Sequence, residues 1–215
     1  MIAPGGRAGA RLADRCGEAS RGGARSMTVD ARVIEAVRAG NADAFELIVR
    51  EYQPRLYRFL YGMVGDAEVA RDLTQDTFLS AYRALPETSA DLNLTGWLFQ
   101  IARNNARSHW RRRKLFAWLP FGRGDGDDER DGEPTIEDRT PLSGPEDLVI
   151  EREALRAALT SLPRADRECL LLSVDGFSYA EICAITDLTL SAVKGRIFRA
   201  RKELRAILEG KDTEP

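Results

Sequence analysis

The chain has 215 residues and nearly balanced charge, with 32 Lys and Arg against 34 Asp and Glu, so it is not a uniformly basic nucleic-acid binder. Its cysteines, Cys16, Cys169 and Cys183, are odd in number and far apart, which argues against a disulfide framework and against a cysteine-rich zinc site. No apolar run approaches the roughly 18–20 residues that a membrane span requires, so any membrane link would come through a partner.

Residues 1–26 differ in composition from the rest of the chain. They are rich in Gly, Ala and Arg, have no hydrophobic periodicity and lack the apolar core of a secretory signal. We predict a disordered N-terminal extension, because such a segment cannot bury enough apolar surface to fold. Met27 directly precedes the first patterned segment. Either Met27 is the natural start of the chain or the extension is dispensable.

Four helices are predicted over residues 29–113, within a first domain that spans residues 27–115. Apolar residues recur there at the spacing of one helix face. Pro54 is expected to kink or divide the second helix, and a loop is expected over residues 87–94. Capping and helix-breaking residues set the predicted boundaries: Gly40, Asn41, Asp66, Pro86 and Thr95.

The helical pattern disappears after the first domain. Residues 125–146 are rich in Asp, Glu, Gly and Pro, a composition typical of a flexible linker, which we place at residues 116–145. This linker begins with apolar side chains, namely Phe116, Trp118, Leu119 and Phe121. They either pack on the first domain or dock on a partner, and the sequence leaves both possibilities open.

A second domain is predicted over residues 146–210, followed by a tail over residues 211–215. Helical periodicity returns at Glu146 and continues to the end of this domain. No strand alternation is found along the chain. The predicted fold class is therefore all-α, with two small helical domains joined by a flexible acidic linker.

The end of the second domain follows the plan of a helix-turn-helix motif. Ser178 is expected to cap a short helix over residues 179–185, and residues 186–188 form a tight turn into a long last helix. That helix has two faces. Its apolar stripe is predicted to anchor it to the domain and consists of Leu190, Val193, Ile197, Ala200, Leu204 and Ile207. Its polar face is predicted to enter a DNA major groove and consists of Ser191, Lys194, Arg196, Arg199 and Lys202.

Positive charge is concentrated in two helices rather than spread along the chain. Residues 97–114 contain five Arg and one Lys without an Asp or Glu, and residues 189–205 contain six cations against Glu203 alone. Segregated cationic helices are typical of nucleic-acid binding. The alternative, an ordinary solvated helix, is disfavoured because acidic partners at i,i+4 are nearly absent. We therefore predict a protein that contacts DNA at two places.

The helix-turn-helix segment resembles region 4 of the extracytoplasmic-function (ECF) sigma factors. Residues 178–185 and 193–204 carry this resemblance, and residues 162–168 are similar to the start of the same region in that family. The chain departs from the family pattern at Asp187, where Gly is usual, and at Gly195, where Ser is commoner. Asp tolerates the left-handed conformation that the turn needs. The resemblance implies that the polar face of the last helix binds the minus-thirty-five element of a promoter.

The first domain resembles region 2 of the same family. Residues 72–78 and 81–85 match the helix that docks on the clamp of RNA polymerase. The resemblance implies that five residues of this helix bind core polymerase: Asp72, Leu73, Gln75, Asp76 and Phe78. The polar residues among them would form an acidic face, and the two apolar residues would hold the helix to its domain.

Residues 97–107 are similar to the promoter-melting helix of the family. The implied contacts with the minus-ten element are Leu94, Trp97, Arg103, Asn104, Arg107 and Arg111. The three arginines, spaced by four residues, would follow a phosphate backbone. Asn104 and the loop over residues 89–94 would hold a flipped base, and Trp97 is expected in the core rather than as a stacking platform.

The resemblance implies a cytoplasmic sigma factor without a cofactor or a catalytic site. Its partners would be core RNA polymerase, through the beta and beta-prime subunits, promoter DNA, and an anti-sigma factor that is commonly membrane-tethered in this family. Three alternatives remain. A helix-turn-helix regulator would have a ligand pocket in residues 29–114 and no second basic helix. A sigma mimic that binds an anti-sigma factor would lack the cationic surfaces. A site-specific recombinase would need a nucleophile and arginines, for which no convincing arrangement exists.

Overall fold

The computed structural model describes residues 31–89, 91–117 and 146–211, and every structural statement below concerns these residues. They form helices without a strand, as predicted. The predicted N-terminal extension, and the predicted linker beyond residue 117 with its apolar side chains, lie outside the described residues. The helices are α2 (Ala31–Arg38), α3 (Ala42–Val64), α4 (Ala67–Ala84), the 3-10 helix η1 (Leu85–Glu87), α5 (Leu94–Ala117), α6 (Glu146–Ser161), α7 (Arg164–Val174), α8 (Tyr179–Thr186) and α9 (Leu190–Lys211).

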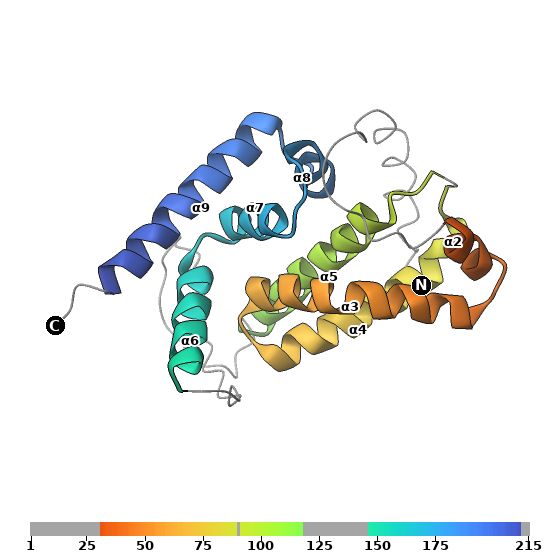
Figure 1. Ribbon diagram of the computed structural model, residues 1–215, viewed down its shortest axis with the longest axis horizontal. Helices are drawn as coiled ribbons and strands as arrows, with labels where there is room; N and C mark the ends of the chain where they lie inside the picture. Colours follow the sequence, from red (N-terminus) through yellow and green to blue (C-terminus); the bar gives the residue numbers. More distant parts are fainter. Residues whose placement is uncertain (1–30, 90, 118–145, 212–215) are drawn as a thin grey trace.

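Helices α2 to α5 form an N-terminal unit in which α3, α4 and α5 lie side by side (Figure 1). Two of the predicted caps are confirmed. The Asn41 side chain accepts a hydrogen bond from the Ala44 amide at 3.2 Å, and Asp66 accepts one from the Val69 amide at 2.8 Å. These bonds satisfy amides that a helix leaves unpaired at its start, so the local sequence fixes where α3 and α4 begin.

The helices of this unit differ from the predictions in detail. Helix α3 continues through Pro54, so this residue does not divide it, which was one of the two predicted outcomes. Pro54 is exposed, so water can donate to the Arg50 carbonyl in place of the N–H that proline lacks. Helix α5 is not capped by Thr95, because Asn93 accepts from the Gly96 amide at 3.1 Å. The Thr95 hydroxyl instead shares a 2.8 Å hydrogen bond with the Tyr52 hydroxyl. Helix α5 also extends to Ala117, beyond its predicted end.

Helices α6 to α9 form a C-terminal unit that contains the predicted helix-turn-helix. Ser178 and Glu181 form a reciprocal capping box at the start of α8. Asp187 adopts φ 58° and ψ 27° in the turn, so this residue takes the left-handed conformation expected of it. On α9, Val193 and Ile197 are buried, whereas Leu190 is 49% exposed. The anchoring stripe of α9 therefore starts later than predicted.

The two units pack on each other. Helices α7 and α8 lie against α3 and α5 (Figure 1), and one continuous cluster of buried residues includes side chains from both units. Phe99 of α5 and Phe177, which precedes α8, meet edge to face with ring centroids 4.8 Å apart. Nothing in the sequence pattern predicts this contact. We call the contact surface between the units the seam.

Candidate nucleic-acid interface

The polar face predicted on α9 lies at the surface of the C-terminal unit. Ser191, Lys194 and Lys202 are exposed, and the side chains of Arg196 and Arg199 are 29% and 59% exposed. The buried side of the helix anchors it against α7 and α8. Since an α-helix fits the major groove of DNA, α9 presents a cationic face of suitable chemistry to a duplex.

Sequence reasoning missed an aromatic residue on this face. Phe198 is 70% exposed, although large apolar side chains are usually buried. It lies four residues after Lys194 and four before Lys202, so helical spacing alone places it among the cations. Apolar side chains in the major groove contact thymine methyl groups. This spacing is the signal that could have identified Phe198.

A buried carboxylate holds two arginines of α9. Asp166, in the first turn of α7, is 4% exposed. Its oxygens accept from Arg199 Nε at 2.9 Å, from Arg199 Nη2 at 3.2 Å and from Arg196 Nη1 at 3.1 Å. The hydrogen bond and the charge of Asp166 raise the pKa of Arg199 above its ordinary value. The two predicted DNA-contacting arginines are therefore pre-positioned within their own unit.

The cationic helix of the N-terminal unit is arranged differently. Arg103 is only 4% exposed, and it lies in the seam. Its Nε donates to the Glu168 carboxylate of α7, and its Nη2 donates to the Thr186 carbonyl of α8 at 2.8 Å. Arg107 lies 3.4 Å from the second oxygen of Glu168. In this arrangement Arg103 cannot reach DNA, whereas Asn104, Arg107 and Arg111 remain exposed.

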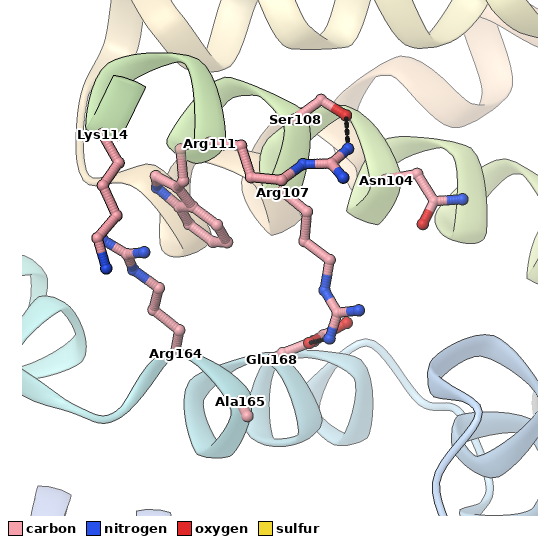
Figure 2. A pocket seen from close by; sticks show the side chains of 9 residues that line it. Asn104, Arg107, Ser108, Arg111, Lys114, Arg164, Ala165 and Glu168 are labelled. Atoms are coloured by element: carbon pink, nitrogen blue, oxygen red, sulfur yellow. Dashed lines mark hydrogen bonds and ion pairs between the residues drawn. The ribbon is translucent and has the colours of Figure 1, made fainter. Parts of the chain in front are cut away.

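A cationic cavity of about 500 Å³ opens between α5 and α7 (Figure 2). Figure 2 shows Arg107 extending from α5 toward Glu168, while Arg111 donates to Ser108 of its own helix at 2.9 Å. The Arg164 guanidinium lies over the Trp110 ring, 4.8 Å from its centroid. Burial, followed by the charges of neighbouring arginines, lowers the pKa of the nearby His109. Because four cations line the cavity, Arg107, Arg111, Lys114 and Arg164, against the carboxylate of Glu168, its wall is electropositive.

Further polar contacts join the two units across the seam. Arg55 of α3 forms an ion pair with Asp175 at 2.7 Å. The fully buried Arg167 donates to the Met63 carbonyl at 3.0 Å, and Arg156 donates to the Gly65 carbonyl at 3.0 Å. Because buried charges are costly unless they are paired, these contacts specify one relative placement of the units.

Two other residues predicted to contact the minus-ten element lie inside the N-terminal unit. Leu94 is 6% exposed, at the start of α5. Trp97 is half-buried and packs against the core, in agreement with the expectation that it is a core residue. Both side chains support α5 in this arrangement rather than presenting a surface for DNA.

The acidic face predicted on α4 is exposed. Asp72, Gln75 and Asp76 point to solvent, while Leu73 and Phe78 are 5% and 7% exposed and pack into the core. Sequence reasoning missed Leu79 and Tyr82, which are 53% and 41% exposed beside this face. Their helical spacing from Gln75 and Asp76 was the available signal. The surface therefore combines acidic groups with apolar area, as a protein-binding surface does.

The part of the chain that the structure describes holds neither a cluster of metal-binding side chains nor a helix that could span a membrane. Within residues 31–89, 91–117 and 146–211, His, Cys, Asp and Glu do not form a group of three or more that could hold a metal ion. Burial raises the pKa of the Cys169 thiol to about 11, which keeps this thiol protonated and unreactive. Over the same described ranges, no helix has both the length and the apolar character to cross a bilayer.

Two family models match the chain, Sigma-70 region 2 over residues 48–116 and Sigma-70, region 4 over residues 152–204. The RNA polymerase sigma-H factor of Pseudomonas aeruginosa is 30% identical over 193 residues, which cover 84% of this chain and 94% of that protein. The ECF RNA polymerase sigma factor EcfG of Rhodopseudomonas palustris is 35% identical over 157 residues, covering 72% of this chain and 80% of that protein.

Two solved structures share the architecture. CnrH in complex with the cytosolic domain of CnrY has a TM-score of 0.63 and 25% identity, covering 85% of this chain and 99% of that chain. The sigma factor RpoE in complex with the anti-sigma factor NepR from Bartonella quintana has a TM-score of 0.59 and 24% identity, covering 78% of this chain and 98% of that chain. The second likeness concerns the fold alone.

Proposed function

The chain belongs to the ECF subfamily of RNA polymerase sigma factors, non-enzymatic proteins that direct RNA polymerase in promoter recognition and transcription initiation, and we propose how its surfaces divide this task. The observation that supports the proposal is the presence of three exposed surfaces, one acidic and apolar on α4 and two cationic on α5 and α9.

Helix α9 binds the minus-thirty-five element as duplex DNA. Its contacts are Ser191, Lys194, Arg196, Arg199 and Lys202, to which the exposure of Phe198 adds an apolar contact. The lysines reach phosphates, which carry no sequence information, while arginine can donate to guanine edges. This assignment follows from a helix-turn-helix whose second helix is exposed along its cationic side.

Helix α5 acts on the minus-ten element. Asn104, Arg107 and Arg111 already face solvent, and Arg103 joins them once the seam opens. An asparagine amide both donates and accepts, which suits a flipped base, and the arginines follow the backbone of the melted strand. Leu94 and Trp97 hold α5 in place, so we assign them a supporting part in this interaction.

Helix α4 docks on the core polymerase. Asp72, Gln75 and Asp76 supply the polar contacts and Leu79 supplies exposed apolar area, while the buried Leu73 and Phe78 keep the helix in its unit. Helix α4 packs against α3, α5 and η1, and its polar face is exposed, so core polymerase can bind it while the seam is closed.

The seam explains why the free chain should bind promoter DNA weakly. Arg103 donates to Glu168 and to the Thr186 carbonyl, so promoter DNA must compete with these internal partners for the same guanidinium. If the chain binds DNA only when the seam is open, its apparent affinity equals the affinity of the open form multiplied by the fraction of molecules that are open. Binding of core polymerase, which holds the two units apart on a promoter, would remove this cost.

An anti-sigma factor is a further proposed partner, and the cytoplasm is the proposed place of action because the polymerase works there. The likeness to CnrH, which was crystallised with the cytosolic domain of the anti-sigma factor CnrY, supports such a partner. A membrane-tethered anti-sigma factor would supply the membrane link that the described helices lack.

In vitro transcription with core polymerase over a randomised promoter library tests this function. The full chain should direct core polymerase to promoters that share a minus-ten and a minus-thirty-five motif. A matched variant that carries Asp72→Lys and Asp76→Lys should keep its helical circular dichroism and lose transcription, because the acidic face is exposed and its charge is reversed. Absence of transcripts with the unaltered chain would contradict the function, and unchanged activity of the double variant would contradict the α4 surface.

A further inference from the structure

Asp166 binds the recognition helix through three hydrogen bonds, two from Arg199 and one from Arg196. It belongs to α7, a different helix from the two arginines, and 33 residues separate it from Arg199. Because a buried carboxylate needs a charged or hydrogen-bonding partner, the pairing has a structural purpose. The geometry of the pairing has a second consequence, which concerns DNA.

Arg199 meets Asp166 with only one edge of its guanidinium. Nε donates to Oδ2 at 2.9 Å and Nη2 donates to Oδ1 at 3.2 Å, so the side edge is occupied. A guanidinium is planar and carries five N–H donors, and the end edge formed by Nη1 and Nη2 keeps its outward donors. The Arg199 side chain is 59% exposed although Asp166 is buried. The carboxylate therefore fixes the plane of the guanidinium without occupying its end edge, whose Nη1 lies 3.5 Å from the position that a Cβ would take on Gly195.

The free edge matches the major-groove edge of guanine. Guanine presents two acceptors there, O6 and N7, and bidentate donation by arginine is the commonest base-specific contact. A flexible arginine loses side-chain entropy when it binds, and a fixed guanidinium has already lost most of it. Two of the other exposed cations of α9, Lys194 and Lys202, have only the rotating point charge of an ammonium, which suits phosphate contacts.

We propose that Asp166 is a positioning residue for DNA sequence recognition, which holds Arg199 so that its end edge donates to both acceptors of one guanine in the minus-thirty-five duplex. The inference rests on the proposed function of α9. It adds that the promoter contains a guanine at the position facing Arg199, and that a residue outside the helix-turn-helix motif determines how strongly this guanine is preferred.

The experiment measures base preference at each minus-thirty-five position with holoenzyme assembled from core polymerase and the full chain. The variants are D166N, R199K, the double variant D166N/R199K and the control E203Q. Asn keeps the size of Asp but offers only one acceptor oxygen, and Lys keeps the charge of Arg without its fork. The control removes one exposed negative charge from α9 at Glu203, which forms no hydrogen bond or ion pair with Arg196 or Arg199 among the described residues.

D166N is expected to reduce the preference for guanine at one position by a factor of about 3 or more, a fraction of the discrimination that a bidentate contact supplies. R199K should reduce it further at the same position. The double variant should equal R199K, because a positioning residue has no effect once the residue it positions is gone. E203Q should leave the preference unchanged at every position.

Three results would overturn the inference: a D166N profile equal to that of E203Q, a uniform loss of affinity at every position, and additive losses in the double variant. Uniform loss would assign Asp166 a structural part only. If D166N is less thermally stable than the wild type, D166E is used instead, because its added methylene displaces the carboxylate and keeps the charge. A base-preference profile of D166E equal to that of the wild type would then overturn the inference. Failure of the unaltered holoenzyme to initiate anywhere would instead contradict the proposed function.

Discussion

The two cationic helices of this sigma factor are both rich in Arg and Lys, but they differ in how far their arginines are exposed. The arginines of α9 are held by Asp166 within their own unit and keep an exposed edge. Arg103 of α5 is held by Glu168 and Thr186 of the other unit and is buried. The pairing within one unit therefore leaves Arg199 59% exposed, whereas the pairing across the seam leaves Arg103 only 4% exposed. An arginine–carboxylate pair thus leaves the arginine exposed in α9 and buries it in α5.

The largest expected effect concerns the buried partner of the seam. Arg103→Met should lower the free energy of unfolding by up to about 3–5 kcal/mol, because it leaves the buried Glu168 without its main partner. Opening of the seam would limit this loss, since water can then reach the carboxylate. Chemical denaturation measures it. Arg111→Met is the matched control on the same helix, and its exposed side chain predicts a change within about 0.5 kcal/mol. Equal losses in both variants would contradict the comparison.

The next effect is on DNA binding by the free chain. Glu168→Gln removes the charge that holds Arg103, so affinity for single-stranded minus-ten DNA should rise roughly tenfold, equivalent to about 1.4 kcal/mol. Fluorescence anisotropy with a labelled oligonucleotide measures this affinity. Glu203→Gln, which removes an exposed charge from α9, controls for the change in net charge. A gain no larger than that of the control would show that the seam does not compete with DNA.

A smaller effect is expected at the edge of the seam. Asp175→Asn breaks the ion pair with Arg55, whose side chains are 12% and 20% exposed. The expected loss of stability is about 1 kcal/mol, since the pair is partly screened by solvent. Chemical denaturation of this variant, alone and combined with Glu168→Gln, reports whether the two contacts contribute to the stability of the seam together or independently. Strictly additive losses would indicate that they contribute independently.

The smallest effect concerns pH. Burial, then Arg113 and Arg112, lowers the pKa of His109 below its ordinary value of 6.5, with Asp66 acting in the opposite direction. The folded chain therefore keeps the neutral imidazole at a pH where the unfolded chain takes up a proton. This contribution to stability is present above 6.5 and is lost as the pH falls through the folded pKa. The free energies of unfolding of the wild type and of His109→Gln, measured as a function of pH, should differ by an amount that changes over that range. A difference that stays constant with pH would contradict the prediction.

Local chemistry explains what could be predicted from the sequence. Asn41, Asp66 and Ser178 begin helices because their side chains accept from amides three residues later, and Asp187 forms the turn because its backbone tolerates the left-handed region. Thr95 was a comparable candidate, but its hydroxyl bonds to Tyr52 and Asn93 supplies the cap. A tertiary contact decided between two chemically suitable residues.

The seam could not be predicted because its partners are distant along the chain. Arg103 and Glu168 are separated by 65 residues, and Arg103 and Thr186 by 83. Within each cationic helix acidic residues are nearly absent, so the sequence of the helix alone predicts arginines that are free to bind DNA. The pairing of Asp166 with Arg196 and Arg199 is hidden for the same reason, because Asp166 belongs to another helix. Helix periodicity identifies which face a residue occupies, but it carries no information on which other element covers that face.

The distance between dye labels on Glu68 of α4 and Glu203 of α9, both exposed, tests the central claim most directly. Single-molecule energy transfer should give one short distance in the free chain, because the seam joins the two units, and a longer distance when core polymerase and promoter DNA are bound. Glu168→Gln should shift the free chain toward the longer distance. A free chain that already shows the long distance, or a distance unchanged in the promoter complex, would contradict the account.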